Sequence, residues 1–299
     1  GRVGSNSQTY LITEGCKYTF GVEIEVNRGF IPQWIAGRKY NLSCVRDGSI
    51  NGGNGGAEYV TGILTGDNGI IHLQEICSEL SKRTLTDKSC GIHLHLGGID
   101  FTNNFIVNSY RLAMILEDEI FLTLPQSRRK NQYCRKLKEF KFKSKTSLPT
   151  SIEEEILLEE DYNMLFKYIS YEKLNNPTFE YNKNTQHPMG AKCGYNHDTP
   201  RYCWLNYVPA MFDTRGNGSR SIEVRPHGAT TNFIKIRNWL LFFMGFMSFV
   251  ENHSDEIKPG LRMKDIINRT MLRKSKSLNM YFEGRISLFS NGEVAEQQE

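Results

Sequence analysis

Three short segments of the chain alternate apolar and polar residues with a period of two. They are residues 22–26 (VEIEV), 92–96 (IHLHL) and 222–225 (IEVR). Successive side chains of a β-strand point to opposite faces of the sheet, so each segment predicts a strand with one apolar and one polar face. The polar faces carry carboxylates, imidazoles and a guanidinium. Three such strands in one chain indicate one sheet whose polar face is an active site.

The rest of the apolar pattern predicts further strands and several helices. Strands are expected at residues 18–26, 40–45, 57–61, 204–209 and 221–225. Asp47-Gly48 and the glycines after it are typical of a hairpin turn between two of them. Helices are expected at residues 69–83, with Asp67 or Asn68 as cap, and at 104–122, 151–168, 232–250 and 263–273. These elements do not alternate regularly, which favours an α+β fold on an antiparallel sheet.

Length and composition indicate one globular domain. Of the 299 residues, 39% are hydrophobic and 23% charged, as in ordinary soluble proteins. We expect a single catalytic domain at residues 11–289, which includes a basic segment at 126–147 and a long loop at 172–200. Residues 1–10 are expected to be disordered or left over from cloning, and residues 290–299 to be a disordered tail. The most apolar run, residues 239–250, is shorter than the roughly 20 residues that span a bilayer.

The number and spacing of the cysteines indicate the redox state of the compartment in which the protein works. All seven are scattered, and no CxxC pair occurs. An odd number without paired spacing fits free thiols in a reducing compartment better than a disulfide framework. We see no segment that resembles a secretory signal. A cytoplasmic location without membrane contact is therefore the expectation.

Glu23 and Glu25 form the first polar pair. Residues two apart on a strand have Cα atoms about 6.5 Å apart. This spacing suits two hard cations about 3.5–4 Å apart, each bound by carboxylate oxygens. The alternative is an exposed strand face with two solvated acids, which is common.

His93 and His95 form the second pair, and Glu223 and Arg225 the third. Imidazole ligates divalent metals or, when protonated, holds a phosphate oxygen, so this pair alone also fits a zinc site. A guanidinium presents forked donors that match carboxylate and phosphate. The alternatives are a core histidine beside a surface histidine, and a solvated ion pair across strands. Residues 226–228 (PHG) are expected to end the strand and so to place Arg225 at the rim of the sheet.

The combined donor set points to the kind of metal. Glu58 lies on the strand that returns from the hairpin and is a candidate ligand, whereas Asp47 is interpreted as a turn former. With Glu58 included, carboxylates outnumber imidazoles, which favours magnesium or manganese over zinc. Magnesium usually serves phosphate substrates, yet the sequence holds neither a GxxxxGK[ST] loop nor a GxGxxG after a strand.

The positive charge is concentrated between residues 128 and 145. This stretch holds nine lysines and arginines and one acid, Glu139, although the chain as a whole carries only +4. It is either a solvated surface or an electropositive wall for a nucleotide or acidic substrate. Nucleic acid is a weaker interpretation, since only Tyr133, Phe140 and Phe142 offer stacking.

Six segments together resemble a known family. In chain order they read FGVEIEV, DGSI with GAEYVTGIL, CGIHLHLGG, SRRKNQYCRKL, RYCWLNYVPAMF and RSIEVRPHGATTN. They resemble the motifs of the putative amidoligase family, which belongs to the carboxylate–amine ligase superfamily with glutamine synthetase and glutamate–cysteine ligase. The resemblance runs from about residue 20 to 232. It implies a curved, mainly antiparallel sheet that forms a funnel, with helices on its outer face, as in the glutamine synthetase catalytic domain.

The resemblance also implies a role for each matching residue. The metal ligands would be Glu23, Glu25, Glu58, His93 and Glu223. The phosphate-binding and catalytic groups would be His95, Arg220 and Arg225. Nucleotide or substrate contacts would also come from Arg128, Arg129, Arg201 and Asn206. Compared with glutamine synthetase, the chain is shorter and lacks the surrounding motifs, so neither ammonia nor glutamate follows as the substrate.

The activity implied is ATP- and Mg²⁺-dependent (or Mn²⁺-dependent) joining of a carboxylate substrate to an amine substrate, through an acyl phosphate. A peptide or protein is a possible substrate, and an oligomer is possible. Two alternatives stay open from the residues alone. One is a zinc-dependent amide or peptide hydrolase that uses both histidines, and the other is a non-catalytic anion-binding module on the same fold.

Overall fold

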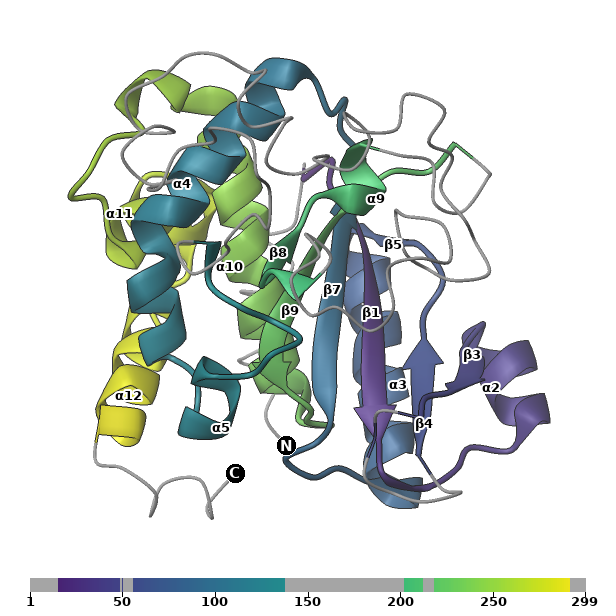
Figure 1. The fold of residues 1–299 in the computed structure, drawn as a ribbon. Coiled ribbons are helices and arrows are strands. Elements are labelled where there is room, and N and C mark those ends of the chain that lie inside the picture. The colour runs from purple at the N-terminus through teal and green to yellow at the C-terminus, as the bar shows by residue number, and fades with distance from the viewer. Residues whose placement is uncertain (1–15, 49, 51–55, 138–201, 212–217, 291–299) are drawn as a thin grey trace, which may run out of the picture.

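We describe a computed structural model of the protein for residues 16–48, 50, 56–137, 202–211 and 218–290 (Figure 1). Its main sheet has the strand order β3-β4-β1-β7-β9-β8, and every adjacent pair is antiparallel. These strands are β1 (Thr19–Val26), β3 (Ser43–Arg46), β4 (Ala57–Val60), β7 (Gly91–Gly97), β8 (Leu205–Asn206) and β9 (Ile222–Gly228). The short strand β5 (Leu64–Thr65) also pairs with β1. A separate ribbon joins β2 (Arg28–Gly29) to β6 (Thr84–Leu85).

Helices cover one face of this sheet. In Figure 1, α3 and α10 lie behind the strands, and α4, α11 and α12 lie beyond α10 on the side of β8 and β9. The longer helices are α2 (Gln33–Tyr40), α3 (Gly66–Arg83), α4 (Asn103–Leu122), α10 (Phe233–Asn252) and α12 (Leu278–Ser290). The shorter ones are α5 (Gln126–Arg129), α9 (Val208–Met211) and α11 (Met263–Asn268), with 3-10 turns at Ser254–Glu256 and Met271–Lys274. The described residues therefore form the predicted mixture of helices and a mainly antiparallel sheet.

The apolar halves of the alternating strands build the core. Val22, Ile24, Leu94 and Val224 are fully buried and belong to the same apolar cluster as the inward residues of α3 and α10. Because alternate residues point to opposite faces, burying this set fixes the register and sends the polar set to the other face. The predicted alternation of these three strands is confirmed.

Helix α10 is longer than its most apolar run suggested. It begins after Asn232, whose side chain accepts hydrogen bonds from the backbone N–H groups of Ile234 and Lys235. With 20 residues it is long and apolar enough to cross a membrane by length and composition, but 72% of its apolar window is buried inside the fold. Burial on this scale is typical of the core helix of a globular protein.

Several predicted boundaries were wrong. Tyr40 ends α2 instead of opening a strand, and β3 begins only at Ser43. Helix α3 begins at Gly66 after Thr65, so neither Asp67 nor Asn68 is its cap residue. Helix α11 ends at Asn268, and α12 was not predicted. The helix expected at 151–168 and the loop at 172–200 lie outside the described residues.

Strand β9 continues through the proline that was expected to end it. Leu94 of β7 pairs with Val224, and Ile92 pairs with His227, so Arg225 and Pro226 together lie opposite His93. Two residues facing one is a β-bulge, and a bulge tolerates proline because the extra residue needs no N–H in the ladder. Arg225 is therefore buried within the sheet, 6% exposed, and does not lie at the rim.

Candidate functional site

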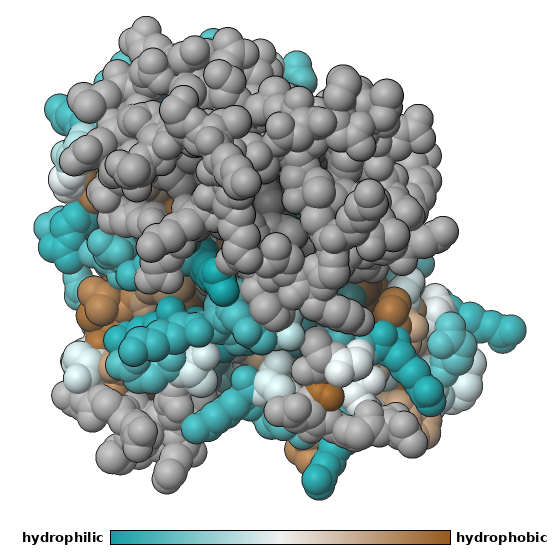
Figure 2. Space-filling model, viewed as in Figure 1, coloured by the Kyte–Doolittle hydropathy of each residue, from teal (hydrophilic) through white to brown (hydrophobic). Residues whose placement is uncertain are grey.

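Strand pairing brings the polar residues of four strands together on the face away from α3 and α10. Glu23 lies opposite His93, His95 opposite Glu223, and Glu25 opposite Glu58. Residues directly opposite in an antiparallel pair share a face, so these side chains converge although they come from distant parts of the sequence. In the same view, Figure 2 shows mostly hydrophilic residues among those coloured on this side.

Glu23 is bound by both histidines. Its Oε1 lies 2.7 Å from Nε2 of His95, and its Oε2 lies 3.0 Å from Nδ1 of His93. Burial alone would raise the pKa of Glu23, but the charge of His95 and the hydrogen bonds from both rings hold the pKa well below its ordinary value. Glu23 is thus kept as a carboxylate at the centre of the face.

Arg225 and Glu223 form a buried ion pair beside this centre. Arg225 Nη1 contacts Glu223 Oε1, and its Nε donates to the backbone carbonyl of Tyr133 at 3.1 Å. The guanidinium also lies 5.8 Å from the ring centroid of Tyr202. Burial would raise the pKa of Glu223, but the charges of Arg225 and His95 hold it below its ordinary value. Neither tyrosine was assigned a contact with Arg225 from the sequence.

The other end of the face has an excess of negative charge. Glu25, Asp47 and Glu58 each place one oxygen within 4.8 Å of the others. Burial, and then the carboxylates of Glu23, Glu25, Asp47 and Glu223, raise the pKa of Glu58 to about 8. Burial also raises the pKa of Glu25, although His93 and the N–H of Gly91 act in the opposite direction. A cation would relieve this repulsion.

Asp47 was interpreted from the sequence as a turn former only. It lies at the end of β3, and Glu58 lies on β4, its partner strand in the hairpin. The signal available in the sequence was an acid on each arm of one hairpin, next to the strand that carries Glu25. The structure adds Asp47 to the candidate ligands.

Among the described residues, three groups of side chains place ligand atoms close enough to hold a divalent ion. They are Glu23 with His95 and Glu223, Glu23 with Glu58 and His93, and Glu25 with Asp47 and Glu58. Adjacent groups share a residue, Glu23 or Glu58, so the three positions follow one another along the face. Carboxylate oxygens outnumber imidazoles in every group, which suits magnesium or manganese better than zinc. The two histidines never fall in the same group.

The two arginines of the basic segment that fall on α5 have different surroundings. Arg128 is 5% exposed and donates to the carbonyls of Pro226 and Arg225 at 3.0 and 3.2 Å. Arg129 instead donates to the carbonyls of Leu122 and Leu124, at the end of α4. The structure therefore brings Arg128, and not Arg129, to the candidate site.

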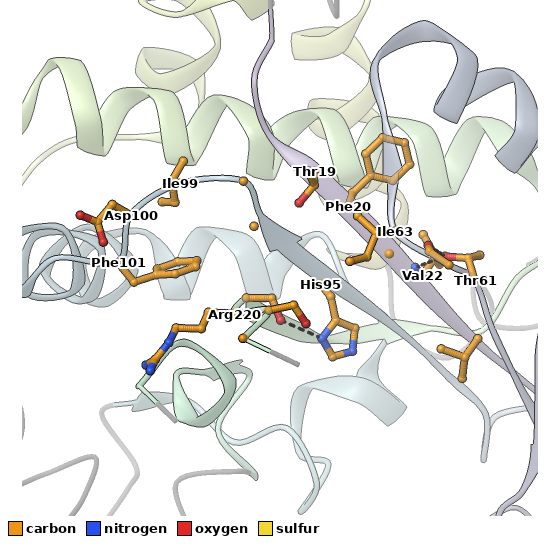
Figure 3. Close-up of a pocket in the computed structure, with 18 residues that line it drawn as sticks. Thr19, Phe20, Val22, Thr61, Ile63, His95, Ile99, Asp100, Phe101 and Arg220 are labelled. Atoms are coloured by element: carbon orange, nitrogen blue, oxygen red, sulfur yellow. Dashed lines mark hydrogen bonds between the residues drawn. The ribbon is translucent and has the colours of Figure 1, made fainter. Parts of the chain in front are cut away.

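A pocket of about 430 Å³ opens beyond His95, at the end of the face opposite to Glu25. Figure 3 shows Phe101 and Ile63 on opposite sides of it, with the His95 ring held through Nδ1 by the Ser221 hydroxyl at 3.3 Å. Its other walls include the backbone of Gly21, Gly62, Gly97 and Gly98. Its lining is mixed, because polar side chains such as Thr19, Asp100 and Ser221 lie beside the apolar ones. Its volume lies in the range of small-molecule sites.

The remaining candidate residues have varied positions. Arg220 lines the pocket and donates to the carbonyl of Ala210 at 3.3 Å. Asn206 of β8 is buried directly opposite Glu223. Arg201 lies outside the described residues.

A fully buried carboxylate anchors the segments that carry Tyr133 and Tyr202. Glu117 of α4 accepts hydrogen bonds from the backbone N–H of Leu137 at 2.7 Å and from Nε1 of Trp204 at 2.9 Å. The Trp204 carbonyl in turn accepts from the N–H of Arg225 at 2.8 Å. Arg225 is thus linked to α4 by hydrogen bonds through Trp204 and Glu117.

A comparison with models of known protein families identifies the family of the chain. A family model described as "putative amidoligase enzyme" matches residues 36–247, more than half of the chain. The match includes Glu58, His93 and Glu223 but begins after β1. Among curated proteins, none matches the sequence.

One solved structure to which the chain is similar is a bifunctional glutathione synthetase from Pasteurella multocida. The identity is 11% and the TM-score 0.45. The alignment covers 98% of this chain and 49% of the other, so the chain spans about half the length of that protein.

Proposed function

Because the chain belongs to the family of putative amidoligase enzymes, we propose that it is an ATP- and Mg²⁺-dependent ligase that joins a carboxylate to an amine through an acyl phosphate. The observation that carries this proposal is the row of three ligand groups next to the Arg225 guanidinium. Divalent metals and a nearby arginine both offset the charge on a phosphoryl group during its transfer, which supports the proposal.

The residues present fit magnesium. The donor sets are rich in oxygen, and the pKa of Glu58 is raised first by burial and then by the neighbouring carboxylates. Glu23, Glu25, Glu58, Glu223, His93, His95 and Asp47 would hold the ions. When bound, Mg²⁺ offsets the charge of the phosphate oxygens during transfer.

The pocket beyond His95 is the proposed place of the nucleoside. Phe101 and Ile63 provide apolar surface for a base, and His95 both lines the pocket and belongs to one of the ligand groups. The triphosphate would then extend toward Glu23 and Arg225. The acid and the amine would enter from the Glu25 end, so that the two ligands approach from opposite ends of a funnel, as in glutamine synthetase.

The proposed chemistry has two steps. A carboxylate oxygen of the first substrate attacks the γ-phosphorus of ATP, and the bond from that phosphorus to the β,γ-bridging oxygen breaks, which gives an acyl phosphate and ADP. The amine nitrogen of the second substrate then attacks the acyl carbon. The bond from that carbon to the phosphate oxygen breaks, phosphate leaves, and the nitrogen loses a proton. Arg225, fixed by Glu223 and Tyr133, would hold the transferred phosphoryl group.

The proposed reaction defines its two substrates by their carboxylate and amine groups. Amino acids, polyamines and the carboxylates or amines of peptides and proteins all fit the reaction, and a product that joins side chains would be an isopeptide. The proposal includes a cytoplasmic protein without nucleic-acid or membrane partners.

Isotope transfer tests the proposal directly. Carboxylate substrates labelled with ¹⁸O would be incubated in pools with ATP, Mg²⁺ and amines, and the released phosphate would be analysed by mass spectrometry. An acyl phosphate predicts that one labelled oxygen moves from the carboxylate to phosphate, with one ADP formed per amide. Unlabelled phosphate together with amide cleavage in the absence of ATP would favour a hydrolase. Tightly bound zinc in the purified protein would also favour a hydrolase.

A further inference from the structure

We propose that Arg128 is a positioning residue that sets the phosphate-binding arginine, Arg225, and that it is not itself a ligand of the nucleotide. This inference rests on the proposed function for its catalytic consequence, but its structural part does not. The resemblance to the family had placed Arg128 among the nucleotide contacts. The geometry points to a different role.

Arg128 donates its hydrogen bonds to the bulge of β9. Its Nε lies 3.0 Å from the carbonyl oxygen of Pro226, and its Nη2 lies 3.2 Å from the carbonyl oxygen of Arg225. These are the two residues that lie opposite the single residue His93 of β7. A bulge breaks the regular ladder, so its carbonyls need partners from elsewhere. The fork of one guanidinium provides both partners.

The same guanidinium also packs closely against Gly91 of β7. A Cβ atom added to Gly91 would lie 2.9 Å from Nη2 of Arg128 and 3.6 Å from Oε2 of Glu25. The N–H of Gly91 donates to that Glu25 oxygen at 2.6 Å. Arg128 therefore lies against both the strand that carries the histidines and the strand that carries Arg225, with the carboxylate of Glu25 nearby.

These contacts indicate that a lysine at position 128 would lose part of the hydrogen bonding to β9. Lysine keeps the charge, but a single ammonium cannot bond two carbonyls in the fixed geometry of the fork. Without the fork, the carbonyl of Arg225 loses the Arg128 donor, while its N–H keeps the bond to the Trp204 carbonyl. Misplacing a catalytic group by about 1 Å can cost about 100-fold in rate.

The test compares Arg128→Lys with Arg285→Lys. Arg285 is a matched control because it is also a buried arginine that donates to a backbone carbonyl, that of Thr123, at 3.0 Å, away from the sheet. Thermal unfolding, ATP affinity, turnover and hydrogen exchange of residues 222–228 are measured for both variants. We expect Arg128→Lys to lower kcat between about 10- and 100-fold with the Kd for ATP nearly unchanged. Hydrogen exchange should rise in β9 for this variant alone.

Gly91→Ala is a second variant that tests the same proposal. The added methyl group should push the guanidinium of Arg128 out of position, although residue 128 itself is not substituted. This variant should also lower kcat and raise exchange in β9. A weaker affinity for ATP in Arg128→Lys, with exchange in β9 unchanged, would overturn the proposal and make Arg128 a phosphate ligand. If the wild-type protein forms no ADP, the proposed function fails, but the exchange comparison between Arg128→Lys and Arg285→Lys still decides the structural claim.

Discussion

Glu23 and His95 meet across two antiparallel strands, with 2.7 Å between the carboxylate Oε1 and the imidazole Nε2. The same carboxylate reaches His93, so it takes part in two of the three ligand groups. Among the described residues, Glu23 is the one shared by the His93 group and the His95 group, so substituting it removes a ligand from both.

Glu23→Gln is therefore expected to weaken metal binding more than any other single change. The loss should exceed the roughly 10–100-fold that removal of a hydrogen-bond partner of a metal ligand costs. Isothermal titration with Mn²⁺ measures it. Glu75→Gln, on the exposed side of α3, is the control and should bind as the wild type does. Equal affinities for the two variants would show that the ligand groups do not hold metal.

Glu58 makes the stability of the metal-free protein depend on pH. Its pKa is about 8 in the folded chain, against an ordinary value of 4.5. Between these values the folded state keeps a proton that the unfolded state has lost, so the contribution to stability is full below about pH 4.5 and is lost as the pH rises through about 8. We expect the melting temperature in EDTA to fall over this range. Glu58→Gln should flatten the fall.

Mg²⁺ should oppose this pH dependence. The cation binds the carboxylate and competes with the proton, so the stabilisation on adding Mg²⁺ should grow from pH 5 to about pH 8. Melting curves with and without Mg²⁺ at several pH values measure it. A shift that is the same at every pH would contradict the assignment of Glu58 as a ligand.

Asp47→Asn should weaken binding at the Glu25 end only. The amide removes one of the three carboxylates of that group and leaves both histidine groups intact. We expect fewer Mn²⁺ ions bound per chain, with the tightest binding retained. Asp118→Asn, which removes the exposed partner of Lys136, is the control. If Asp47 is only a turn former, both variants will bind the wild-type number of ions.

Phe101→Ala should weaken the affinity for ATP if the pocket beyond His95 holds the base. Stacking of a base on an aromatic ring contributes about 1–3 kcal/mol. Fluorescence titration with an ATP analogue measures the loss. Phe101 also packs edge to face on Phe105, so the melting temperature is measured in parallel. Phe30→Ala, at an exposed phenylalanine, is the control. Unchanged affinity in the folded Phe101 variant would place the base elsewhere.

Glu117→Leu should destabilise the fold strongly. It leaves two buried donors, the N–H of Leu137 and Nε1 of Trp204, without their acceptor, at a cost of about 2–5 kcal/mol. Glu117→Gln keeps an oxygen acceptor and should cost less. Urea unfolding measures both. A loss below about 1 kcal/mol in Glu117→Leu would show that these bonds do not hold the segments beside Arg225.

The sequence predicted those parts of the fold that follow from local periodicity. The alternation at Val22–Val26 predicted a strand with one apolar and one polar face. Once the apolar side is buried, a period of two allows only one arrangement, so Glu23 and Glu25 must share the polar face. The burial of Ile70, Leu73 and Leu80 on α3 followed in the same way. Helix α12 was not predicted, although it has the same kind of signal: Leu278, Phe282, Arg285 and Phe289 repeat every three or four residues.

The other features that the sequence did not predict depend on tertiary contacts. Pro226 ends a regular strand locally, and only the bulge opposite His93, with Arg128 on its carbonyls, allows β9 to continue. Asp47 looks like a turn residue until the hairpin folds beside Glu25. The surroundings of Arg128 and Arg129 differ because α5 turns one side chain toward the sheet and the other toward α4.

Binding of Mn²⁺ together with ATP, followed by electron paramagnetic resonance, tests the central claim most directly. The account predicts that the wild-type protein holds more than one Mn²⁺ per chain, that ATP tightens this binding, and that Glu23→Gln abolishes the effect of ATP. If Mn²⁺ is found only free or as its complex with ATP at every protein concentration, or if Glu23→Gln gives an identical titration, the account is contradicted.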